Sequence, residues 1–336
     1  LNELLRVLSE VWLSDSLGVG NDRWVRDAIA SSAGVLVVAT PVFLLHWGYI
    51  QQRLDSTAER HAALRKFALY VAEAITLGYA IYAVFDLLRG VAFLAFGGPV
   101  ADSRILPSDW LYLMLLALAA GALQFYFHRT LLEDGDYGNE KGVAGVWRRL
   151  YQSIAGLVGL VMLLVGGGLL IETFLSEMLN QFNPGIGASI WRDQASAAVA
   201  LLLVGAVLTR FNWQRWQAII AAHPQEGKTG LRRFYLYAGV VISALTALVP
   251  ATFLLRELLL ILFGEGTGPL SALLDELTGP LAFLPVGIAS WLWYRRYLRL
   301  EAAEYGDSAE STTMRRIYAY LVSATALGLA WTGAVF

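Results

Sequence analysis

The stretch LRRFYLY at residues 231–237 joins two adjacent cations to an aromatic residue and then to a long apolar run. Near-copies occur at three other places, which are LRKFALY at 64–70, WRRLYQS at 147–153 and MRRIYAY at 314–320. The second cations of the pairs follow one another at almost constant spacing, and they are Lys66, Arg149, Arg233 and Arg316. A fixed period of about 83 residues is the signature of a repeat array. We therefore expect four tandem units.

The composition disfavours an ordinary water-soluble domain. The chain is 57% hydrophobic and 15% charged, whereas soluble domains carry roughly a quarter of charged residues. Apolar runs at 32–50, 110–127 and 196–208 reach or approach the length of about 20 residues that crosses a bilayer. Several such runs follow one another, so neither a signal peptide nor a single anchor explains them. The sequence predicts an all-α, polytopic integral membrane protein.

Each unit is expected to contain two spanning helices. Helix A is apolar and closes in an aromatic and basic cluster such as FNWQRW, and a polar loop follows. The cation pair then opens helix B, which rises about 35 Å before the next ionisable position, slightly more than the hydrocarbon core. The eight predicted spans are 30–50, 66–88, 109–127, 149–171, 194–211, 233–255, 279–295 and 316–336. The expected interface anchors are Lys66, Arg149, Arg233, Arg316, Trp24 and Trp191.

The period also predicts where the units begin and end. We expect residues 1–23 to end a preceding repeat, followed by repeat 1 at 24–107, repeat 2 at 108–190, repeat 3 at 191–274 and a truncated repeat 4 at 275–336. Arg6 stands one period before Arg89, and its surroundings, NELLRVL, resemble TFLLREL at 252–258. The chain has no initiator Met and stops inside an apolar run. These features predict an interior piece of a longer repeat protein, forming one continuous membrane domain.

The positive charges predict the orientation of the helices. The A-to-B loops with their flanking helix ends carry 18 of the 25 lysines and arginines, and few lie in the B-to-A loops. By the positive-inside rule the A-to-B loops are expected to be cytoplasmic. Two helices in each unit also make the repeats parallel, unlike the inverted pairs of many transporters.

Glu73 is the clearest candidate for chemistry inside a span, where ionisable residues are functional hypotheses by default. It lies seven residues into helix B, about 10 Å past Lys66 by helical rise. The equivalent positions hold Gly156, Val240 and Ser323, so the repeat does not require an acid there. A proton or cation site and a single structural hydrogen bond near the interface are both open interpretations.

Three further ionisable residues share one repeat position, at the far end of helix B from the cation pair, and they are Arg89, Glu172 and Arg256. They are candidates for binding an anion or for holding units together. The alternative is that they mark the end of helix B at the edge of the hydrocarbon, where neighbours pair.

His46 and His128 lie at the ends of the first two A helices, and facing histidines there are candidates to ligate a haem or a chlorin magnesium. The alternative is that both are polar interface residues. The chain has no cysteine, which removes thiolate chemistry and cysteine metal sites. No Walker loop, zinc-protease motif or nucleophile elbow occurs, so we expect no catalytic residues and no metal site. The run GLVGLVMLLVGGG at 156–168 predicts close helix packing.

The recurring motif resembles a group of bacterial multi-pass membrane domains of unknown function, which share tandem Arg-Arg-x-Tyr helix starts and an upstream Trp-Arg-Asp element. The matching residues are RRLY at 148–151, RRFYLY at 232–237, RRIYAY at 315–320, WVRD at 24–27 and WRD at 191–193. The chain departs from the pattern at RKFALY and at SDW. The resemblance implies the plasma (inner) membrane of a bacterium, and it assigns no catalytic residues.

The leading functional hypothesis is a non-enzymatic membrane scaffold or accessory subunit of a larger assembly, with no cofactor. Its expected partners are the lipid bilayer and other membrane subunits or further copies of the chain. The net charge of −2 implies no nucleic acid. One alternative is a channel or transporter with a path between parallel repeats, lined by Glu73, Arg89, Glu172 and Arg256. A second is a haem- or chlorin-binding subunit that uses His46 and His128.

Overall fold

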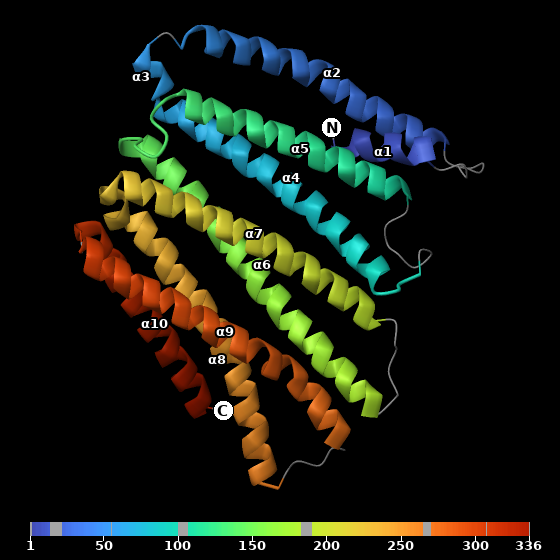
Figure 1. Cartoon of the computed structure of the whole chain (residues 1–336), viewed down its shortest axis with the longest axis vertical. Helices are drawn as coiled ribbons and strands as arrows, with labels where there is room; N and C mark the ends of the chain where they lie inside the picture. The colour runs from blue at the N-terminus through green and yellow to red at the C-terminus, as the bar shows by residue number, and fades with distance from the viewer. Residues whose placement is uncertain are drawn as a thin grey trace. The chain divides into compact units, whose positions relative to one another are not determined.

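The computed structural model describes residues 2–13, 22–54, 56–99, 107–182, 190–264, 270–306 and 308–335, and within these ranges it contains helices and no strand (Figure 1). Within the same ranges, seven helices are long and apolar enough to cross a membrane. A helix satisfies every backbone polar group internally, which the hydrocarbon core demands of a spanning segment. The prediction of an all-α, polytopic membrane protein is confirmed.

The helices contain the predicted spans and extend beyond them. They are α1 (Asn2–Leu13), α2 (Asp22–Gln52), α3 (Thr57–Arg60), α4 (Ala63–Ala95), α5 (Pro107–Glu133), α6 (Gly142–Phe182), α7 (Ile190–Ala222), the 3-10 helix η1 (Pro224–Lys228), α8 (Gly230–Leu262), α9 (Leu270–Tyr305) and α10 (Ala309–Val335). The first seven predicted spans lie within α2 and α4 to α9, which are the seven apolar helices. The eighth, 316–336, falls on α10, which is not among the seven, and its last residue lies outside the described part of the chain.

The internal contacts divide the chain into two compact units, residues 1–148 and residues 149–336. In unit 1, α4 and α5 pack side by side and antiparallel, and α1 packs on both α5 and α2. The buried core of this unit joins Ala83 of α4 to Tyr112, Leu113 and Leu116 of α5, with Leu5 of α1 packed against them. No described residue in the most apolar part of α2 is buried.

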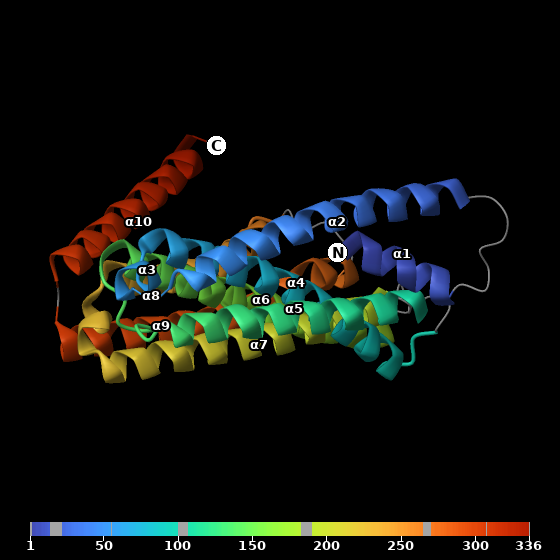
Figure 2. The same ribbon diagram turned by 90° about the horizontal axis from the view of Figure 1, so that it is seen from above.

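In unit 2, α8 packs along α9, and α10 contacts α8. Its core joins Leu160 and Leu164 of α6 to Tyr235 and Leu236 of α8 and to Tyr294 of α9. Figure 2 shows α10 leaving α9 at their shared end and diverging from it.

Glycines allow α6 and α7 to approach closely, as the run at 156–168 predicts. A Cβ atom on Gly166 would lie 2.6 Å from the backbone nitrogen of Leu202, and one on Gly205 would lie 2.6 Å from that of Leu163. No side chain fits at such distances, so the two helix backbones are in direct contact at these positions.

Candidate functional site

The start of α4 in unit 1 carries two cations that are bound to carboxylates beyond the end of α5. Lys66 is fully buried, and its Nζ lies 3.0 Å from Asp134 Oδ2 and 2.5 Å from Asp136 Oδ1. Arg65 donates to the other oxygen of Asp134 at 3.0 Å. A buried cation is tolerated only when it is paired and hydrogen-bonded, so these carboxylates hold the start of α4 against the end of α5.

A second buried cluster in unit 1 centres on Glu140, just before α6. The hydroxyl of Tyr70 donates to Glu140 Oε1 at 2.7 Å, and Arg148 Nε donates to Oε2 at 2.6 Å. The backbone N–H of Gly138 donates to the same Oε2 at 3.0 Å. Arg148 and Glu140 have no exposed side-chain surface, so this carboxylate ties three segments of unit 1 together.

Unit 2 holds equivalent pairs where α6 and α8 begin. Arg149 binds Glu226 of η1 through two bonds, of 2.8 and 2.7 Å. Arg232 is fully buried, donates through Nε to Glu301 Oε2 at 3.2 Å, and makes a second bond to Oε1 of the same carboxylate. Bidentate arginine–carboxylate pairs are the strongest geometry for a buried ion pair.

The neighbouring Arg233 binds backbone rather than side chains. It donates to the carbonyl oxygens of Glu301 and Gly306, at 3.1 and 3.2 Å. It therefore caps the end of α9 and the turn that follows.

One arrangement occurs in both units at equivalent sequence positions. Arg65 and Asp134 have the same separation along the chain as Arg232 and Glu301, and the second pair stands two repeat periods after the first. The guanidinium of Arg65 also lies 5.8 Å from the ring of Trp47, and that of Arg232 lies 4.7 Å from the ring of Trp213. The same cation–aromatic–carboxylate set thus joins three helices in each unit.

The predicted interface anchors have different surroundings. Lys66 and Arg233 are buried and bound, Arg149 is largely buried and bound, and Arg316 is exposed. Trp191 is half-buried beneath the guanidinium of the adjacent Arg192. The side chain of Trp24 lies outside the described residues.

The sequence reasoning missed the acidic partners of the cations, which are Asp134, Asp136, Glu226 and Glu301. The available signal was that Asp134 and Glu301 stand two periods apart, as Lys66 and Arg233 do.

Glu73 and His128 are brought together between α4 and α5. Glu73 is 1% exposed, and its Oε1 lies 3.0 Å from His128 Nδ1. Its Oε2 is buried and has no hydrogen-bond partner among the described residues. One turn further along α4, Thr76 donates to Gln124 Oε1 at 2.6 Å across the same interface. This polar cluster lies within the predicted span 66–88 and at the end of the predicted span 109–127.

His46 and His128 have different hydrogen-bond partners. His46 is exposed on α2, and its Nδ1 bonds to the carbonyl of Val42 in its own helix at 2.7 Å. His128 uses its Nδ1 for Glu73, and its ring meets Tyr137 edge to face. Each imidazole thus has a different local role.

The three ionisable residues predicted at the far ends of the B helices lie on three different helices, α4, α6 and α8. Arg89 of α4 is half-buried and is an electrostatic neighbour of Asp86. Arg256 of α8 is exposed and pairs with the adjacent Glu257. Glu172 of α6 packs close to α9.

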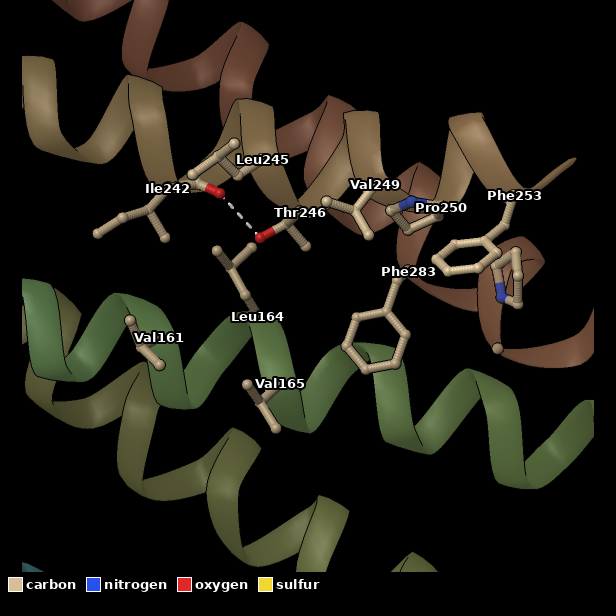
Figure 3. A pocket seen from close by; sticks show the side chains of 12 residues that line it. Val161, Leu164, Val165, Ile242, Leu245, Thr246, Val249, Pro250, Phe253 and Phe283 are labelled. Carbon is tan, nitrogen blue, oxygen red and sulfur yellow. Dashed lines mark hydrogen bonds between the residues drawn. The ribbon is translucent and has the colours of Figure 1, made fainter. Parts of the chain in front are cut away.

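An apolar cavity of about 360 Å³ lies between α6, α8 and α9 (Figure 3). Figure 3 shows the rings of Phe253 and Phe283 near one end and Leu164 of α6 below α8. The hydroxyl of Thr246 donates to the carbonyl of Ile242 in its own helix at 2.8 Å. No described lining residue is ionisable.

Prolines lie within three of the apolar helices. Pro41, Pro250 and Pro285 are in α2, α8 and α9, and all three helices continue through them. Pro250 lines the cavity between α6, α8 and α9. Because proline has no backbone N–H, it cannot donate the helical hydrogen bond to the carbonyl four residues earlier.

A second cavity of about 480 Å³ lies between α6, α7 and α9, and its described lining is also apolar apart from hydroxyl groups. Among the described residues, no group of three or more histidines, aspartates and glutamates is arranged to hold a metal ion. Neither cavity offers charged groups to a polar ligand.

The helices and their buried charges define the class, an all-α polytopic membrane protein in which ion pairs join neighbouring helices. The chain belongs to the family described as domain of unknown function DUF5671, whose model matches residues 1–122 and 149–280. No curated protein and no solved structure matches the chain.

Proposed function

We propose that the chain is a non-enzymatic scaffold or accessory subunit of a larger membrane assembly. The observation that carries the proposal is the use of the buried charges. The cations near the starts of α4, α6 and α8 are bound to carboxylates at or beyond the ends of α5, α7 and α9. Such contacts fix helices relative to one another, which is what a scaffold requires.

The two apolar cavities of unit 2 support the same proposal. Both lie among apolar helices and have no ionisable lining residue in the described part of the chain apart from the phenol of Tyr294. A pathway for ions or polar solutes needs groups that replace water around the solute. Cavities of this composition fit lipid chains or neighbouring apolar side chains instead.

The surface of α2 also favours a role in assembly. Val35, Val38 and Leu45 are 68%, 67% and 72% exposed, and they lie on a helix whose most apolar part has no buried residue. In a bilayer this surface is available to lipid and to other membrane subunits or copies of the chain.

The proposed setting is the plasma (inner) membrane of a bacterium, with the A-to-B loops in the cytoplasm. The excess of lysines and arginines in these loops supports this orientation. The proposal keeps the four parallel repeats, and the displacement of two periods between the Arg65–Asp134 and Arg232–Glu301 pairs supports them.

A transport function is the rival, and reconstitution separates the two. Proteoliposomes containing the wild-type chain or the Glu73→Gln variant would be compared with protein-free liposomes for ion flux. The scaffold proposal expects no flux above the protein-free level in either sample. Flux through the wild type that is lost in Glu73→Gln would overturn it.

The cofactor alternative has its own readout. Haem or chlorin bound through His46 and His128 would give the protein, purified from its own membrane, a visible absorption band. The scaffold proposal expects no such band. A band that disappears in the His46→Ala or His128→Ala variant would support the cofactor-binding alternative instead.

A further inference from the structure

Glu73 lies in α4, one of the helices that are long and apolar enough to cross a membrane. It is seven residues beyond Lys66, which corresponds to about 10 Å along the helix axis. The side chain is 1% exposed and faces α5. An ionised carboxylate at such a place is costly unless its charge is balanced and its oxygens are hydrogen-bonded.

The hydrogen bonds of Glu73 are incomplete. Oε1 lies 3.0 Å from His128 Nδ1, whereas Oε2 is buried without a hydrogen-bond partner among the described residues. An ionised carboxylate would leave this oxygen as an unsatisfied acceptor. Protonation removes the charge that makes such an oxygen expensive to bury.

The charged groups nearest to this pair on the same helix faces balance one another. Toward the start of α4, Arg65 and Lys66 are paired with Asp134 and Asp136, two cations with two anions. Other titratable groups on these segments are His61, whose Nε2 lies 3.8 Å from Asp136 Oδ2, Tyr137, which touches the His128 ring, and the cluster of Tyr70, Glu140 and Arg148, in which one anion meets one cation. The ion pairs of Arg65, Lys66 and Arg148 leave no surplus positive charge for Glu73.

A proton count gives the favoured net charge of the pair, and the unpartnered Oε2 is the observation that places the proton on Glu73. Glu73 as carboxylate beside neutral His128 has a net charge of −1, and adding one proton brings the pair to zero. Burial in an apolar environment favours the neutral state. The side chain of His128 is 22% exposed, so the pair is not sealed inside the protein.

The other unit shows that packing does not require an acid here. Gly156 stands one repeat period after Glu73, and Asn212 stands one period after His128 to within a single position. A Cβ atom on Gly156 would lie 2.3 Å from Asn212 Nδ2, so the two positions face each other as Glu73 and His128 do. The same helix contact therefore forms without ionisable residues.

We propose that Glu73 and His128 form a buried proton-binding site between α4 and α5, in which Glu73 holds the proton as a neutral carboxylic acid. A hydronium ion gives up its proton with cleavage of one of its O–H bonds, a new O–H bond forms on a carboxyl oxygen of Glu73, and a water molecule is left. The proposal is independent of the scaffold function, because it concerns occupancy of a site and not assembly.

The test is labelling of the full chain in lipid nanodiscs by an apolar carbodiimide, which reacts with protonated carboxyl groups in apolar surroundings. Peptide mass spectrometry would locate the label. We expect label on Glu73 at neutral pH, loss of the label as the pH is raised, and no protection by sodium at constant pH. Glu73→Gln should lose this label, whereas the exposed-site variant Glu133→Gln should keep it.

A second variant keeps the test informative if Glu73→Gln fails to fold. In His128→Leu the acid remains but Oε1 loses its partner, so the pH dependence of Glu73 labelling should differ from that of the wild type. Absence of label on Glu73 at every pH would overturn the proposal. Protection by sodium would show that the site binds a sodium ion instead of a proton. An unchanged pH dependence in His128→Leu would show that His128 is not part of the site.

Discussion

The buried pair of Arg232 and Glu301 gives the sharpest test of the energetic account. In Glu301→Gln, the guanidinium of Arg232 stays charged and fully buried, because arginine does not lose its proton in proteins. Removing one partner of a buried ion pair costs about 3–5 kcal/mol. We expect the free energy of unfolding to fall by about this amount, measured by titrating the protein in mixed micelles with a denaturing detergent.

The matched control is Glu133→Gln, the same chemical change in an exposed pair. Arg129 and Glu133 are 2.7 Å apart, with side chains that are 66% and 60% exposed, and such a helical pair contributes about 0.3–0.5 kcal/mol. Replacing both members of the buried pair, in Arg232→Met with Glu301→Leu, should recover most of the lost stability. Equal destabilisation by Glu301→Gln and Glu133→Gln would refute the reasoning.

Two further predictions concern packing and orientation. Gly205→Ala should lower the free energy of unfolding by about 1–3 kcal/mol through overpacking, because its Cβ would lie 2.6 Å from the backbone nitrogen of Leu163. Gly78→Ala is the control, since a Cβ there would have nothing within 4 Å. It should raise the free energy of unfolding by about 0.5–1 kcal/mol in the same detergent titration. An unchanged stability in Gly205→Ala would contradict the direct backbone contact. The chain has no cysteine, so single introduced cysteines can report the orientation of the helices. A membrane-impermeant maleimide should label Phe263→Cys in intact cells and Glu133→Cys only after lysis. The reverse labelling pattern would show that the topology is the opposite of the one proposed.

The membrane helices could be predicted from the sequence because the hydrocarbon imposes a simple rule. A run that crosses it must be apolar and helical for about 20 residues, and the run at 149–171 accordingly lies within α6. The helix itself extends from Gly142 to Phe182, because hydropathy marks only the apolar part of a helix. Helix α1 is not predicted as a separate helix, because it is too short to be recognised as a span. Its residues are assigned only as the end of a preceding repeat.

The side-chain partners could not be predicted in the same way. The cation pairs recur with a nearly constant period, but their acids lie in loops or at helix ends, where geometry selects the acid that meets each cation. Glu73 and His128 are 55 residues apart on two helices, and their contact depends on how each helix is rotated about its axis. A sequence period carries no information about that rotation, so the sequence presents the two residues as unrelated candidates.

The most direct test of the central claim is native mass spectrometry of the protein extracted gently from its own membrane. The scaffold account expects the 36.8 kDa chain within an assembly of fixed stoichiometry, containing other membrane subunits or further copies of itself. A lone chain that carries only lipid, found under conditions that preserve other membrane complexes from the same extract, would contradict it.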